Sequence, residues 1–500
     1  MTLTTALVWS ISRSLLLPTL ALYPAFGAMN LLAFLKQRRR TQILVAFLML
    51  LPLLIPDLLI GFTYQLTAAR LAHHVSVSEL LYAGLLLIKV TSLQVAALMI
   101  LRHSSVSPES LHAWKMLSAN QQRSRFHDRR TLLVLWVNGP LRPVIIGWAI
   151  SALYCFQEFE TAALIQLNRH PVSWTVWLFD AHADNESLTK SLLLASRAML
   201  FQVLLLAPFF VLLNAGADRS QTSSTRAALW NRFGKKTTSI IPGILFTALA
   251  VWTFVLWPKL CHSSAALNGL AVLSQRGSLF PSLQQILWSL LAAVIAAGLS
   301  LGLGVVLHRM KQKRLTWTVL LPGLSGPLIL SLVLLQLFQL PGINVAYDTW
   351  LPMILGGMLL LGPRAWLLIH LLNVTAPPST IHSAQLLKRS TFFGIVKQAQ
   401  WVLWRLRTVR WLIALAILTH WCFWDVTIYS ILRPVSFEAV VTRLYNEMHW
   451  AASETMLAMT TLSLLVPVLL FLVAGSVSTA LPLIRGRWRQ RKFAPSGVNS

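Results

Sequence analysis

The sequence predicts an all-α polytopic membrane protein, and three observations lead to that fold class. Of the 500 residues, 56% are hydrophobic and 11% are charged, whereas about 25% of the residues of a soluble domain are charged. The mean hydropathy is +0.65, and the apolar residues form stretches of about 20, the length of a transmembrane helix. The charge is unequal, with 42 Lys and Arg against 15 Asp and Glu, which is typical of basic loops between spans rather than of nucleic-acid binding. The 3 cysteines exclude a disulfide scaffold.

About 11 stretches are long enough to cross the membrane. They lie near residues 12–35, 42–64, 80–101, 143–166, 188–212, 240–258, 284–307, 316–339, 350–372, 409–431 and 456–482. A basic cluster, Lys36 and residues 38–40, follows the first stretch, whereas a cleavable signal peptide has its basic residues in front. We therefore expect an uncleaved first span with its N-terminus outside.

The distribution of basic residues predicts the orientation. Alternate connections hold 32 of the 42 Lys and Arg residues, and the connections of the opposite face hold 7. Basic residues are enriched in cytoplasmic loops. We therefore expect a cytoplasmic C-terminus and a multi-pass protein of the cell (inner) membrane.

Short strings recur between the two halves of the chain in the same order. Residues 155–158 (Cys-Phe-Gln-Glu) recur as residues 422–425 (Cys-Phe-Trp-Asp), and residues 171–174 (Pro-Val-Ser-Trp) recur as residues 434–437 (Pro-Val-Ser-Phe). Upstream, the proline pair 52 and 56 matches the pair 322 and 327. This ordered series indicates an internal repeat.

The repeat predicts the domain organisation. Five spans fall in each copy and one extra span, 240–258, lies between them. The copies are shifted by an even number of spans and are expected to be parallel, unlike the inverted repeats of many secondary transporters. We predict a first repeat over 1–213, a linker and extra helix over 214–258, and a second repeat over 259–500. Eleven helices or twelve remain possible, because only the second copy is preceded by an extra span.

Each copy has a long cytoplasmic segment between its third and fourth spans, over 104–141 and 374–408. Both are too polar to cross the membrane, and the second has apolar residues near helical spacing. They resemble the coupling segment of binding-protein-dependent ABC importer permeases, and the whole chain is similar to the fused two-copy iron(III)/thiamine type of that family. The residues at the family's coupling positions are His112, Ala113, Leu117 and Ser118 in the first copy, and His382, Ala384, Leu387, Lys388 and Ser390 in the second.

The two copies depart from the family pattern at two positions. His112 and His382 stand where the family has Glu, and Ser118 and Lys388 stand where it has Gly. The alternative interpretation of each segment is a basic amphipathic helix on anionic lipid.

The resemblance implies partners and an activity. A periplasmic substrate-binding protein would deliver the substrate, iron(III) by preference and thiamine second. Two ABC ATPase subunits would bind the cytoplasmic segments, and lipid would surround the spans. The chain itself would be a permease and not an enzyme, with no cofactor. Residues 233–238 are similar to the end of a nucleotide-binding loop, but Leu229 stands where that loop requires its first Gly, so ATP would be hydrolysed by the separate ATPase subunits. The alternatives are a transporter without a motor and a membrane-embedded enzyme that processes lipid or sugar substrates.

Three acids inside spans are candidates for the translocation pathway: Asp57, Glu158 and Asp425. An ionised carboxylate in the membrane faces a bundle interior or a water path. Glu158 and Asp425 are equivalent in the two copies and are expected to approach each other at the pathway of a cationic or metal-bearing substrate. The alternative is a structural pairing with a Ser, Thr or Arg of a neighbouring helix. No zinc-ligand spacing occurs among the 13 histidines, so no metal site is predicted.

Overall fold

A computed structural model describes most of the chain. The described residues are 2–101, 116, 133–137, 141–166, 171–184, 187–214, 240–275, 277–310, 313–375, 378–387, 393–404, 406, 409–450 and 454–493. Within them the secondary structure is helical and no β-strand occurs. The predicted all-α class is therefore confirmed for the part of the chain that is described.

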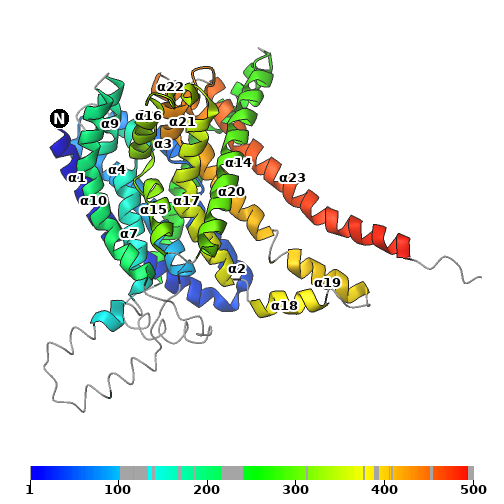
Figure 1. Cartoon of the computed structure of the whole chain (residues 1–500). Coiled ribbons are helices and arrows are strands. Elements are labelled where there is room, and N and C mark those ends of the chain that lie inside the picture. Colours follow the sequence, from blue (N-terminus) through cyan, green and yellow to red (C-terminus); the bar gives the residue numbers. More distant parts are fainter. Residues whose placement is uncertain are drawn as a thin grey trace, which may run out of the picture. The chain divides into compact units, whose positions relative to one another are not determined.

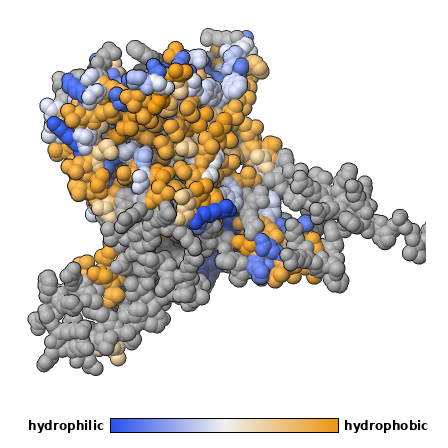
Figure 2. All heavy atoms as spheres, in the orientation of Figure 1, coloured by the Kyte–Doolittle hydropathy of each residue, from blue (hydrophilic) through white to orange (hydrophobic). Residues whose placement is uncertain are grey.

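Among the described residues, seven helices are long and apolar enough to cross a membrane, and up to 10 if each of three bent helix pairs forms one span. The seven are Leu3–Gln37, Val75–Ile100, Leu188–Ala207, Ile241–His262, Leu279–Arg309, Trp350–Ile369 and Glu454–Ser476. Among the coloured residues of Figure 2, apolar side chains form a broad band, as expected of helices in contact with lipid. A polytopic helical membrane protein is thus supported.

The predicted span near 143–166 does not form one long helix. It consists of α7 (Arg142–Gln157) and α8 (Glu160–Ile165), which are separated at Glu158 and Phe159. Because 16 and 6 residues are each fewer than the about 20 needed to cross the hydrocarbon layer, neither piece can span alone. The total of eleven therefore stays a prediction.

The chain divides into two compact units, Met1–Ser263 and Ser264–Ser500. The first unit contains α1 (Leu3–Phe34), η1 (Leu35–Gln37), α2 (Arg39–Leu50), η2 (Leu51–Leu53), α3 (Asp57–Leu71), α4 (Val75–Ile100), α7, α8, α9 (Trp174–Ala183), α10 (Leu188–Asn214), α12 (Ile241–Val251), the π-helix η3 (Trp252–Leu256) and the start of α13 (Trp257–Gln275). The predicted extra helix is thus part of the first unit. Most of its predicted linker, 215–239, lies outside the described residues.

The second unit contains, after the end of α13, α14 (Leu279–Arg309), α15 (Lys313–Leu324), α16 (Pro327–Phe338), η4 (Asn344–Ala346), α17 (Trp350–Thr375), α18 (Pro378–Leu387), α19 (Phe393–Trp404), α20 (Arg410–Phe423), α21 (Val426–Leu432), α22 (Val440–Trp450) and α23 (Glu454–Phe493). Figure 1 labels many of these helices. Apart from α12, η3 and α13 around the boundary and η4, α18 and α19 in the second unit, both units contain in order a long helix, a bent helix pair, a long helix, two helices separated by a short break, a short helix and a long helix.

Corresponding helices also pack in corresponding pairs. In the first unit α1 packs on α4 and α7, α3 packs on α8, and α9 packs on α10. In the second unit α14 packs on α17 and α20, α16 packs on α21, and α22 packs on α23. The described helices of the two units thus pack in similar pairs, and the internal repeat with its five spans a copy stays a prediction.

Proline and glycine account for the first break of each unit. The helices on either side bend by 74° before Asp57 and by 104° before Pro327. Pro56 is extended at the N-cap of α3, and Gly326 precedes α16 with a φ of 91°, which favours glycine because it has no Cβ. Proline lacks an N–H and disfavours helix in the residue before it, so both spans break where the paired prolines stand.

Candidate functional site

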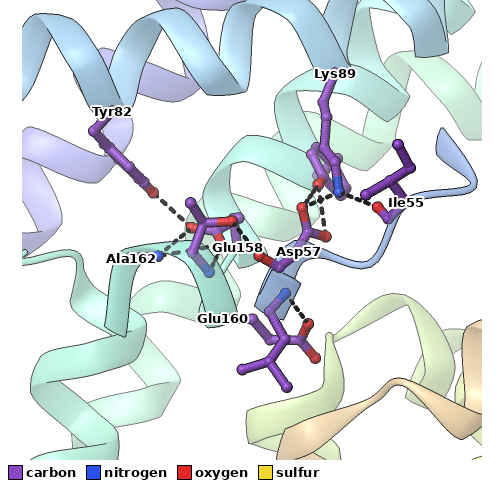
Figure 3. A network of polar contacts seen from close by, with 10 residues as sticks. Ile55, Asp57, Tyr82, Lys89, Glu158, Glu160 and Ala162 are labelled. Carbon is purple, nitrogen blue, oxygen red and sulfur yellow. Dashed lines mark hydrogen bonds and ion pairs between the residues drawn. The ribbon is translucent and has the colours of Figure 1, made fainter. Parts of the chain in front are cut away.

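The candidate site of the first unit lies where α3 and α8 begin. These helices pack against each other, and each begins in the interior of a broken span. A helix N-terminus leaves N–H groups without partners, which is costly away from water. Three acids, Asp57, Glu158 and Glu160, gather at these two N-termini (Figure 3).

Glu158 caps the second half of its own broken span. Its Oε1 accepts a hydrogen bond from the backbone N of Thr161 at 2.6 Å, and its Oε2 accepts from the backbone N of Ala162 at 3.3 Å. The Tyr82 hydroxyl donates to Oε2 at 2.6 Å. With a side chain on the positive end of α8, the buried carboxylate is stabilised by the helix dipole as well.

Glu160 caps the neighbouring broken span. Its Oε2 accepts from the backbone N of Leu58, in the first turn of α3, at 3.2 Å. In return, the Thr161 hydroxyl donates to the carbonyl of Asp57 at 3.2 Å. The N-terminal turns of α3 and α8 are thereby tied to each other in both directions.

Asp57 is paired with a lysine. Its Oδ1 accepts from Lys89 Nζ in an ion pair, and the Tyr154 hydroxyl lies 2.8 Å from each carboxylate oxygen. Lys89 is only 5% exposed and also donates to the carbonyl of Ile55 at 2.9 Å (Figure 3). One ammonium group thus satisfies both a carboxylate and a carbonyl that the helix break leaves free.

A second buried ion pair lies beside this cluster. Arg13 of α1 forms two hydrogen bonds of 2.7 Å to the carboxylate of Glu79 and further ones to Ser173 Oγ at 3.0 Å and the carbonyl of Pro171 at 2.7 Å. Its guanidinium carbon lies 5.1 Å from the ring centroid of Tyr82, the residue that donates to Glu158. The polar groups of the first unit thus extend from the start of α9 to the helix breaks.

The second unit has a matching cap, and no matching ion pair occurs among its described residues. Asp425 is the N-cap of α21 and accepts from the backbone N of Ile428 at 2.8 Å. Leu328 follows the matched proline where Asp57 stands in the first unit. Arg364 stands at the same position in α17 as Lys89 in α4, but it is exposed and lies over the Trp421 ring at 5.4 Å.

Both units fix their short helix by a serine of the first long helix. Ser10 Oγ of α1 accepts from the backbone N of Trp174, the first residue of α9, at 3.0 Å. Ser289 Oγ of α14 accepts from the backbone N of Val440, the first residue of α22, also at 3.0 Å. These hydroxyls satisfy helix N-termini that no water reaches.

The candidate coupling residues are described only in part. His382 and Leu387 of α18 are exposed, whereas Ala384 is buried against α19. His112, Ala113, Leu117, Ser118, Lys388 and Ser390 lie outside the described residues.

The arrangement favours positioning of helices over metal binding. The described oxygens of Glu158, Glu160 and Asp57 accept from backbone N–H, hydroxyl and ammonium groups of the protein. Within the described residues no group of three or more His, Cys, Asp or Glu could hold a metal ion. The expectation that Glu158 and Asp425 approach each other stays a prediction.

Sequence reasoning did not find Lys89, Tyr82 and Tyr154 as members of the site. A signal existed for Lys89 and also for Arg13, because a basic residue inside an apolar stretch needs a partner. The two tyrosines gave no signal, because the sequence does not show which tyrosines are buried or which carboxylate their hydroxyls reach.

Comparisons with protein-family models, with curated proteins and with solved structures found no match to this chain.

Proposed function

We propose that the chain is the permease of an ATP-driven ABC importer, with both transmembrane halves in one polypeptide. The observation that carries the proposal is the common plan of the two units together with the α18–α19 pair. A protein of two equivalent halves suits alternating access, in which the pathway between the halves opens first to one side of the membrane and then to the other. The proposed arrangement has eleven helices, as two parallel five-helix repeats with one extra helix between them.

The α18–α19 pair supports a cytoplasmic partner. The two helices pack on each other through a face that includes the buried Ala384 and Ala399. Leu386, Leu387 and Trp401 are 53%, 50% and 54% exposed. Apolar side chains on a short helix pair in a basic segment suit a protein surface, and in this proposal that surface belongs to an ABC ATPase, one copy for each half.

The outer partner and the substrate rest on the family resemblance. A periplasmic binding protein would deliver iron(III) by preference, or thiamine, to the outer turns 167–187 and 433–454. The acids at the helix breaks do not distinguish these substrates, because their oxygens are bonded within the protein. The inner-membrane location, with the N-terminus outside and the C-terminus in the cytoplasm, is supported by the 32 basic residues of one face.

Copurification of the full chain from its own cells tests the proposal. We expect a nucleotide-binding ATPase to copurify with the wild type, and to be lost when Leu386 and Leu387 are both changed to Asp. The control is Val435→Asp, at a side chain that is 88% exposed in an outer turn, which should keep the ATPase.

Failure of the wild type to retain any ATPase would overturn the importer in favour of a motorless transporter. The pathway hypothesis has its own test in cells that carry both Glu158→Gln and Asp425→Asn. Normal uptake of ferric iron and of thiamine by these cells, relative to the wild type, would exclude these acids from the pathway.

A further inference from the structure

The first break of the first unit is braced from two neighbouring helices. Lys89 of α4 reaches across to Ile55 and Asp57, and Tyr154 of α7 reaches the same carboxylate. Charged and hydroxyl groups on two separate helices therefore hold the few residues between η2 and α3. In a medium of low dielectric these contacts are strong.

The extra helix covers the same broken span from another side. α12 packs on α1, α2, α4 and η2. At its crossing with α1, a Cβ on Gly27 would lie 2.8 Å from the backbone N of Gly243, so the two backbones are in direct contact. Further along, the Tyr64 hydroxyl of α3 donates to the carbonyl of Thr253 at 3.1 Å, inside the π-helical turn where the regular helix bonds are shifted.

The matched positions of the second unit carry different chemistry. Leu328 takes the place of Asp57, and Thr427 takes the place of Glu160. The cation, Arg364, is exposed and stacks on Trp421, which itself stands where the first unit has Tyr154. At the break, Gly326 gives α16 no side-chain cap.

Apolar packing and a charged brace respond differently to a change of conformation. Apolar side chains can slide past each other and regain equivalent contacts. An ion pair away from water must lose its whole interaction before the groups find new partners. Among the described residues an ion pair reaches the first unit's break, and no described ion pair reaches the second unit's break, where α16 begins after Gly326.

We propose that Lys89 is a positioning residue that fixes the broken span of the first unit, so that the broken span of the second unit is the one that moves. This asymmetry rests on the proposed function for its purpose, because a mobile and a fixed half would divide the work of transport. The fixing of the span by Lys89 is a property of the chain alone.

Amide hydrogen exchange of the full chain tests the proposal, in nanodiscs of phosphatidylethanolamine and phosphatidylglycerol without nucleotide or partner. In the wild type we expect slower exchange over residues 51–62 than over 322–332. Lys89→Met should raise exchange over 51–62 by about tenfold or more. The matched control, Arg364→Met, should change exchange over 322–332 by less than about twofold.

Two further variants and a reference helix separate the ion pair from general unfolding. Lys89→Arg, which keeps the charge, should restore most of the protection, and α10 serves as the reference for general unfolding. If Lys89→Met does not fold, Tyr154→Phe removes only one hydroxyl and should give a smaller rise confined to 51–62.

Equal exchange at the two breaks of the wild type would overturn the proposal, as would a Lys89→Met variant whose exchange rises equally in α10. Because no ATPase is present, these outcomes are independent of whether the importer proposal succeeds.

Discussion

The two units stabilise their helix breaks with different polar contacts. Each contains a second broken span whose later half, α8 or α21, begins next to an acid that caps it, Glu158 or Asp425. Around this shared cap the first unit adds the buried pairs Arg13–Glu79 and Lys89–Asp57. The ion pair described in the second unit, Arg443–Glu447, is half-exposed and lies within one helix.

The caps occur in both units, whereas the ion pairs between helices are described only in the first. A helix break in apolar surroundings leaves N–H groups without helix partners, and at the second break of each unit a carboxylate accepts from some of them. Ion pairs between helices are not required for that purpose, since the second unit breaks its spans without the same buried pairs. They restrict how the helices of the first unit can move against each other.

The largest expected difference concerns the arginines of the two units. Arg13→Met removes a buried guanidinium from a carboxylate that it binds through two hydrogen bonds, which should cost about 3–5 kcal/mol of unfolding free energy. Arg443→Met acts on a side chain that is 41% exposed, and it should cost less than about 1 kcal/mol. Unfolding in mixed micelles measures both, and equal costs would remove the distinction between the units.

The first long helices of the two units should differ in their tolerance of alanine. Gly27→Ala places a methyl group 2.8 Å from the backbone of α12, and such overpacking costs about 1–3 kcal/mol. Gly298→Ala in α14 places it in open space, where alanine is the better helix former by about 1 kcal/mol or less. The same unfolding assay applies, and a destabilised Gly298→Ala variant would contradict the prediction.

The two capping acids should show a smaller difference. Glu158→Gln loses charge from a carboxylate that accepts from two backbone N–H groups and a tyrosine, and we expect a loss of about 1–2 kcal/mol. Asp425→Asn should cost about 0.5 kcal/mol or less, because asparagine is an equally common N-cap. A larger loss for Asp425→Asn would show that Asp425 has a role in the second unit beyond the cap.

The helical class and the places where spans break follow from local features of the sequence. The hydropathy pattern gave the long helices, and the proline pairs marked the first break of each unit. The break at Glu158 was not foreseen, because an acid in an apolar stretch looks the same whether it lines a pathway or caps a helix. The partners of Asp57 also lay beyond sequence reasoning, because Lys89 and Tyr154 come from helices whose rotation about their axes is set by packing.

The smallest expected effect concerns the short helix α9 of the first unit, where burial lowers the pKa of His182 below its ordinary 6.5. The unfolded chain takes up a proton at this residue first, so the folded form should lose stability as the pH falls below about 6.5.

Asp180 in the same helix should show the opposite pH dependence. Burial, and secondly the charge of Asp184, raises the pKa of Asp180, so the stability that its protonated form contributes is lost as the pH rises above about 4. We therefore expect the difference in unfolding free energy between His182→Gln and the wild type to widen in favour of the variant on acidification, and that for Asp180→Asn to widen in favour of its variant as the pH is raised from 4. Thermal unfolding between pH 4 and 8 measures both, and differences that do not change with pH would show that folding shifts neither pKa.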